Sequence, residues 1–89
     1  MPRYLVERRF PGAAELPVET VVERNADVGV TWFHSYVSED ARTMFCVYDA
    51  PSPEAIRKAA RRSDLPVDRI TKVRVLDPYF YLGEEREQS

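Results

Sequence analysis

Strand-like and helix-like runs alternate along this chain of 89 residues in an order that few folds accommodate. Apolar alternation predicts strands at Arg3 to Arg9, Val30 to Val37, Thr43 to Ala50 and Arg69 to Leu76. Helical spacing predicts helices at Val18 to Ala26 and from Pro53 to a stop before Pro66. The polar segment Ser38 to Arg42 has the length of a hairpin connection between the two middle strands.

The start of the second helix is the clearest local feature. Ser52 stands at an N-cap position, Pro53 at the first helical position, and Glu54 near the positive end of the helix dipole. The two helices and four strands therefore follow the order β-α-β-β-α-β.

This order is typical of the ferredoxin-like unit of the α+β class. Right-handed crossovers place both helices on one face of a four-stranded antiparallel sheet, in strand order 4-1-3-2. The other face of the sheet then stays open. We expect residues 1–82 to form a single domain and the charged residues 83–89 to be a disordered tail.

Charge and hydropathy exclude several classes of partner. The chain has 13 basic and 15 acidic residues and no basic run that would follow a phosphate backbone, so we expect no nucleic acid partner. No apolar stretch approaches the roughly 20 residues that span a bilayer, and the N-terminus lacks the apolar core of a signal peptide. We expect a cytoplasmic protein without a membrane partner, in keeping with its single cysteine, Cys46.

Strand parity assigns side chains to the two faces of the sheet. The more apolar sets are predicted to face the helices, namely Tyr4, Val6, Arg8, Phe33, Ser35, Val37, Phe45, Val47, Val73 and Val75. The alternate sets are predicted to face outward, namely Leu5, Glu7, Arg9, Trp32, His34, Tyr36, Met44, Cys46, Tyr48, Lys72 and Arg74.

A hairpin that pairs symmetrically about Asp40 sets Tyr36 against Met44, His34 against Cys46, and Trp32 against Tyr48. The Cβ atoms of His34 and Cys46 would then lie about 4.5–5.5 Å apart. Glu7 comes from the next strand. His34, Cys46 and Glu7 are a donor set that nickel, zinc or copper accepts. Trp32, Tyr36 and Tyr48 would surround it as an aromatic, ligand-binding surface that a second subunit or a ligand covers.

Other interpretations stay open at this stage. Cys46 can be a small buried hydrophobe and His34 a residue of a dimer interface. A Cys-His nucleophile pair has no oxyanion donor that the sequence identifies, so the catalytic residues are unknown. The chain could also be a small-ligand or interaction module, or a cofactor-free enzyme with His34 as its acid-base group, of the dimeric α+β barrel type. Whether it is an enzyme is therefore left undecided.

Four stretches carry a family resemblance: PRYLVER from Pro2, WFHSYV from Trp32, CVYDAP from Cys46 and EAIR from Glu54. In order and spacing the chain resembles the small bacterial nickel-responsive, nickel-binding proteins, from about Pro2 to Val75. The resemblance implies a ferredoxin-like fold, homodimers or higher homo-oligomers joined through the sheet face, and nickel or another divalent transition metal as the cofactor. The family's second helix usually has a histidine where Ala59 stands here, and a glycine where Asp64 follows it.

Overall fold

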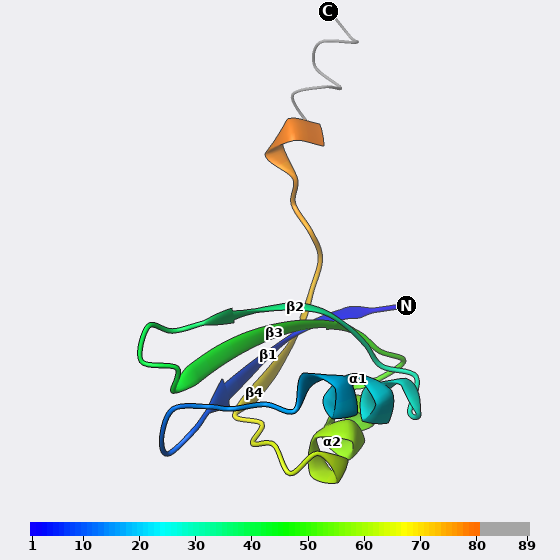
Figure 1. Cartoon of the computed structure of the whole chain (residues 1–89). Coiled ribbons are helices and arrows are strands. Elements are labelled where there is room, and N and C mark those ends of the chain that lie inside the picture. Colours follow the sequence, from blue (N-terminus) through cyan, green and yellow to red (C-terminus); the bar gives the residue numbers. More distant parts are fainter. Residues whose placement is uncertain (81–89) are drawn as a thin grey trace, which may run out of the picture.

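The computed structural model describes residues 1–80, which form a four-stranded antiparallel sheet with two helices on one side (Figure 1). The elements are, in order, β1 (Arg3–Arg9), α1 (Val18–Ala26), β2 (Thr31–Val37), β3 (Thr43–Asp49), α2 (Pro53–Arg62) and β4 (Arg69–Val73). The sheet order β2-β3-β1-β4 is the predicted order read from the opposite edge, so the ferredoxin-like α+β prediction is confirmed. The predicted domain boundary at residue 82 and the tail 83–89 lie outside the described residues. Within residues 1–80, no helix has the length and apolar character needed to cross a membrane.

Local sequence fixes the start of α2 as predicted. The side chain of Ser52 accepts a hydrogen bond of 3.3 Å from the backbone N–H of Ala55, and Pro53 occupies the first turn. The cap satisfies one of the backbone donors that a helix leaves unpaired at its N-terminus, and proline loses nothing there because its missing N–H would have had no partner.

At the end of α2, Asp64 takes the position that a glycine has in the family pattern. The N–H of Leu65 donates to the carbonyl of Ala60 at 2.9 Å, and the N–H of Asp64 donates to the carbonyl of Arg61 at 3.3 Å. These two bonds are the Schellman pattern, which needs one residue in the left-handed region. Asp64 takes that position with φ of 54°, and aspartate is one of the few residues other than glycine that tolerates it.

The core lies between the helices and the sheet face that they cover. Its buried members are Tyr4, Val6, Val30, Met44, Cys46, Tyr48, Ala50 and Ile56. Tyr4, Val6 and Arg8 of β1 all point into it, as predicted from strand parity. Arg8 is only 3% exposed, so this core contains a guanidinium group.

β3 presents to the helices the face opposite to the one predicted. The buried set is Met44, Cys46 and Tyr48, whereas Phe45 and Val47 are half-buried on the other side. The prediction failed because both sets are apolar, so hydropathy could not choose between them. Pairing with β1 made the choice, since each buried β3 residue lies opposite a buried β1 residue, in the pairs Arg8 with Met44, Val6 with Cys46, and Tyr4 with Tyr48.

β4 also presents to the helices the face opposite to the one predicted. It ends at Val73, three residues earlier than predicted. Its pairing with β1 puts Ile70 and Lys72 on the helix side and Val73 on the other side, so the predicted inward position of Val73 is wrong. Ile70 packs against the core, while Val75 lies beyond the strand and is 68% exposed.

The hairpin between β2 and β3 closes with an even number of loop residues. The N–H of Ser38 donates to the carbonyl of Thr43 at 2.9 Å, and the hydroxyl of Ser38 bonds the Asp40 carboxylate at 2.7 Å. A register that is symmetric about a single residue requires an odd number of loop residues. The predicted pairing of β2 with β3, symmetric about Asp40, is therefore excluded next to the turn.

The shifted register changes the partner of the histidine. His34 pairs with Val47, so the predicted pair of His34 with Cys46 is wrong, and so is that of Tyr36 with Met44. A bulge at Phe33 then restores the predicted register, and Trp32 does pair with Tyr48. A bulge adds one unpaired residue and leaves its two positions on the same side of the strand.

Candidate functional site

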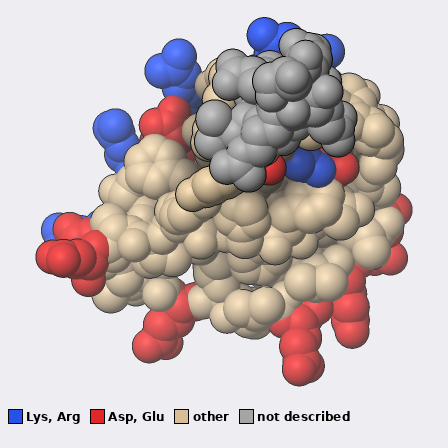
Figure 2. Space-filling model, turned by 90° about the horizontal axis from the view of Figure 1, so that it is seen from above, with Lys and Arg blue, Asp and Glu red and all other residues tan. Residues whose placement is uncertain are grey.

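All four strands contribute side chains to the sheet surface that faces away from the helices, here called the open face. Its members are Arg3, Leu5, Glu7, Arg9, Thr31, Phe33, His34, Tyr36, Thr43, Phe45, Val47, Asp49, Arg69, Thr71 and Val73. Viewed from that side, the uncovered surface is mostly uncharged in the middle, and charged side chains lie mainly towards its margin (Figure 2). Phe33 and Tyr36 are 46% and 64% exposed, which is a large apolar surface for so small a chain.

The bulge in β2 brings His34 onto the open face beside a second aromatic ring. Phe33 lies under the guanidinium of Arg3, 4.4 Å from Cζ to the ring centroid, and Arg3 is itself held by Asp49 at 3.0 Å. His34 is exposed and meets the ring of Tyr36 edge-on, with centroids 5.3 Å apart. The imidazole is therefore accessible from the open side.

Glu7 shares the open face with His34 but lies on a different part of it. β1 is separated from β2 by β3, a spacing of about 10 Å across the sheet. The Glu7 carboxylate is 3.8 Å from the Nε of Arg69 on β4, at the opposite side of β1 from the histidine. Within one chain, Glu7 and His34 do not form a joint site.

Cys46 lies on the other side of the sheet. It is 1% exposed and packs in the core, so the interpretation of this cysteine as a small buried hydrophobe is confirmed. The predicted donor set is thus divided between two faces, with His34 and Glu7 outward and Cys46 inward. Within residues 1–80, no three histidine, cysteine, aspartate or glutamate side chains are grouped to hold a metal ion.

The predicted aromatic surround is divided too. Of Trp32, Tyr36 and Tyr48, only Tyr36 lies on the open face. Trp32 packs against the ring of Tyr48, with centroids 6.3 Å apart, and donates from Nε1 to the hydroxyl of Ser35 at 2.9 Å. These two rings lie on the helix side of the sheet, away from the open face.

Tyr48 and Arg8 form a buried polar pair beneath the helices. The Nη2 of Arg8 donates to the phenol oxygen at 3.1 Å, and Nη1 donates to the carbonyl of Pro66 at 2.6 Å. Arg8 Nε has no hydrogen-bond partner within the described residues. Burial raises the pKa of Tyr48 from 10.0 to about 12, and the neighbouring Cys46 thiol adds to that effect while Arg8 opposes it. The phenol therefore stays neutral as a hydrogen-bond acceptor.

The burial of Cys46 makes a direct prediction. In the folded protein, a water-soluble disulfide reagent should label this thiol at least roughly tenfold more slowly than in denaturant, because attack requires an exposed thiolate. Stopped-flow absorbance of the released thiol measures both rates. Equal rates would mean that the thiol lies on a solvent-accessible surface, as the strand-parity prediction had it.

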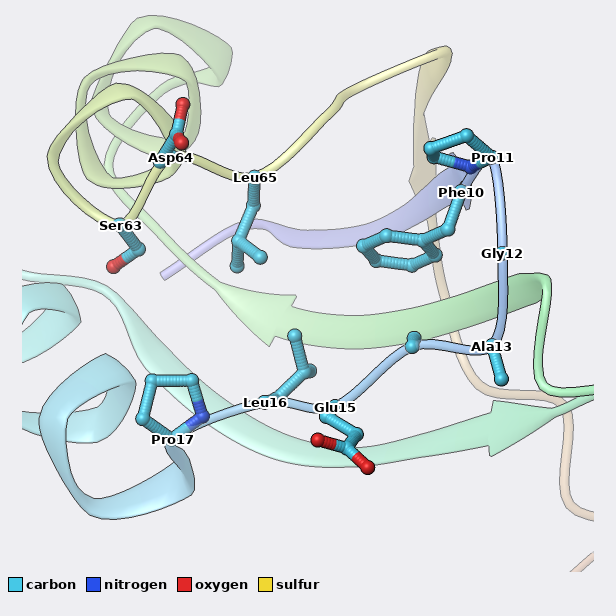
Figure 3. A pocket seen from close by; sticks show the side chains of 11 residues that line it. Phe10, Pro11, Gly12, Ala13, Glu15, Leu16, Pro17, Ser63, Asp64 and Leu65 are labelled. Carbon is cyan, nitrogen blue, oxygen red and sulfur yellow. The ribbon is translucent and has the colours of Figure 1, made fainter.

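A separate hollow lies between the segment after β1 and the end of α2 (Figure 3). It measures about 340 Å³, near the lower end of small-molecule sites. Phe10, Leu16 and Leu65 line it with apolar surface, and Glu15 and Asp64 stand among the lining residues. No motif in the sequence indicates this hollow, because it joins two segments that lie about 50 residues apart in the chain.

Comparison with known proteins identifies a family that the chain matches. A family model described as nickel responsive protein SCO4226-like matches residues 4–73. The structure is similar to the crystal structure of SCO4226 from Streptomyces coelicolor A3(2), with a TM-score of 0.66 and 16% identity, over 84% of this chain and 99% of that one. No curated protein matches the chain significantly. At this identity the structural likeness establishes the fold alone.

Proposed function

Because the chain belongs to the family of SCO4226-like nickel-responsive proteins, we propose that it binds a divalent transition metal such as nickel at the open face of a homodimer. His34 of each copy is the ligand in this proposal. The supporting observation is its exposed imidazole on the open face, whose charged side chains lie mainly towards the margin. Imidazole is a donor that nickel, zinc and copper all accept.

A single chain does not fit a metal ion, since its described residues group no three suitable donors. A two-fold dimer changes this, because it presents the same surface twice and doubles each donor on the open face. Two imidazoles would then be available, and Glu7 is a carboxylate on the same face that a second copy supplies, whereas the Asp49 carboxylate of that face is paired with Arg3. Cys46 has no part in the site because it is buried on the helix side. A reducing, cytoplasmic location suits this unpaired thiol and belongs to the proposal.

The apolar side chains on the open face support the dimer. Leu5, Phe45 and Val47 are half-buried, and Phe33 is 46% exposed. Apolar area releases about 25 cal/mol for each Å² removed from water, so covering this surface with a second copy is favourable.

Calorimetric titration of tag-free, metal-free protein with nickel chloride near pH 7.5 tests the proposal. We expect wild type to bind about one nickel per two chains, and His34→Ala to bind at least about tenfold more weakly because both imidazoles are lost. Cys46→Ala is the matched control, since it removes the other soft donor of the sequence and should leave the affinity unchanged. Zinc and copper are titrated in parallel to rank the metals.

Two results would contradict the proposal. One is the absence of binding heat for wild type at millimolar metal. The other is equal affinity of wild type and His34→Ala, which would place the metal elsewhere on the chain.

A further inference from the structure

Residues 74–80 form an extension, here called the C-terminal arm. It continues from β4 and stands off the side of the sheet opposite to the helices (Figure 1). Asp77 accepts a hydrogen bond from the N–H of Tyr79 at 2.9 Å, and Pro78 begins a helical turn. Asp77 and Pro78 therefore repeat the capping arrangement of Ser52 and Pro53, a sequence feature overlooked in the element prediction. The arm has local structure of its own, and it lies outside the segment matched by the family model.

The arm exposes apolar side chains to an unusual degree. Val75 is 68% exposed, Leu76 72% and Tyr79 81%. Each of these side chains leaves most of its surface in water, which costs on the order of 1–2 kcal/mol apiece relative to burial. Soluble chains tolerate single exposed apolar residues, but three within five positions on a projecting segment indicate a contact surface.

The open face by itself is small for a stable dimer. Four strands about 4.8 Å apart and up to seven residues long cover roughly 400 Å² in projection, a footprint that suits an interface at the lower end of the usual range of about 600–1,000 Å² of accessible surface per partner. Tyr79 alone can bury about 150–250 Å². An arm laid across a partner would therefore add substantially to the area that the two copies bury.

We infer that the C-terminal arm of each copy packs against the open face of the other copy. The inference rests on the proposed dimer and adds a second contact to it. The arm leaves the edge strand β4 and runs away from its own sheet, while the exposed aromatic residues Phe33 and Tyr36 lie on β2 at the far edge. A two-fold arrangement lets both arms make this contact at once, so each covers apolar surface that its own chain leaves open.

Sedimentation velocity over a concentration series of the full chain tests the inference. We expect the double variant Leu76→Ser with Tyr79→Ser to raise the dimer dissociation constant at least about tenfold. Its matched control is Val18→Ser with Val22→Ser, which alters two exposed apolar residues on α1, away from the open face, and should leave the constant unchanged. Circular dichroism melting verifies that both variants stay folded.

The outcomes separate the two proposals. If wild type is a dimer and the arm variant has the same dissociation constant, the arm inference is overturned and the proposed dimer stands. The arm would then be free in solution or packed on its own sheet. If wild type stays monomeric at 100 µM or above, on the order of a hundred times a micromolar dissociation constant, the proposed dimer and the arm contact both fail. Tryptic cleavage after Arg74 adds a direct measurement, since it should slow as the chain concentration rises in wild type and not in the arm variant.

Discussion

Replacing Ile56 by alanine should lower the free energy of unfolding by about 2–5 kcal/mol. Ile56 is 1% exposed on the face of α2 that packs against the sheet, so the shorter side chain leaves a cavity that the surrounding side chains fill only in part. A domain of this size has about 5–15 kcal/mol of stability in total, so this one change removes a large share of it. Urea unfolding followed by circular dichroism measures the difference.

Val22→Ala is the control for this experiment. Val22 lies on α1 and is 47% exposed, so alanine removes little buried surface there and should change stability by less than about 0.5 kcal/mol. Alanine also favours a helix at both positions, so helix propensity acts in the same direction in the two variants. Equal losses of stability would show that α2 does not cover the core as described.

Stability at high pH should depend on Tyr48. Its pKa is raised from 10.0 to about 12 in the folded chain by burial. Below pH 10 the phenol is protonated in both the folded and the unfolded chain, so it adds no pH dependence to the free energy of unfolding. Between pH 10 and 12 the unfolded chain loses the proton and the folded chain keeps it, so the folded state loses roughly 2–3 kcal/mol as pH rises through this window.

Tyr48→Phe separates this effect from other alkaline titrations. At neutral pH the variant should be about 1–3 kcal/mol less stable, because Nη2 of Arg8 loses its phenol acceptor in the core. Its stability should then fall less steeply between pH 10 and 12 than that of wild type. Ile56→Ala serves as the control, since it is also destabilised but keeps the phenol. Parallel profiles for wild type and Tyr48→Phe would contradict the assignment.

Much of the fold could be predicted from local features. The bounds of β1 and α1 agree with the structure residue for residue, and the Ser52 cap forms as predicted. These elements rest on short-range physics, namely backbone hydrogen bonds, capping and the period of apolar residues, which the chain carries in consecutive positions. The connection rules then allow few arrangements of the strands, and the observed sheet order is the predicted one.

The candidate site was harder to predict because it depends on which face each strand shows. For β3 the two alternating sets are Met44, Cys46, Tyr48 and Phe45, Val47, and both are apolar. A one-residue shift of register moves every side chain to the opposite face, so the site assignment was only as reliable as the assumed turn. The partners that decided it belong to β1, some 40 residues earlier in the chain.

The sequence by itself determined the element order, the helix ends and the presence of His34 in a strand, since each follows from neighbouring residues. Only the tertiary structure decided that His34 faces outward, that Cys46 is buried and that the two lie on opposite sides of the sheet. The physical reason is that side-chain direction in a strand has a period of two, which leaves two equivalent choices for a strand that is apolar on both faces. The even hairpin loop closed by Ser38 and Thr43, the bulge at Phe33 and the pairing with β1 together selected one of them.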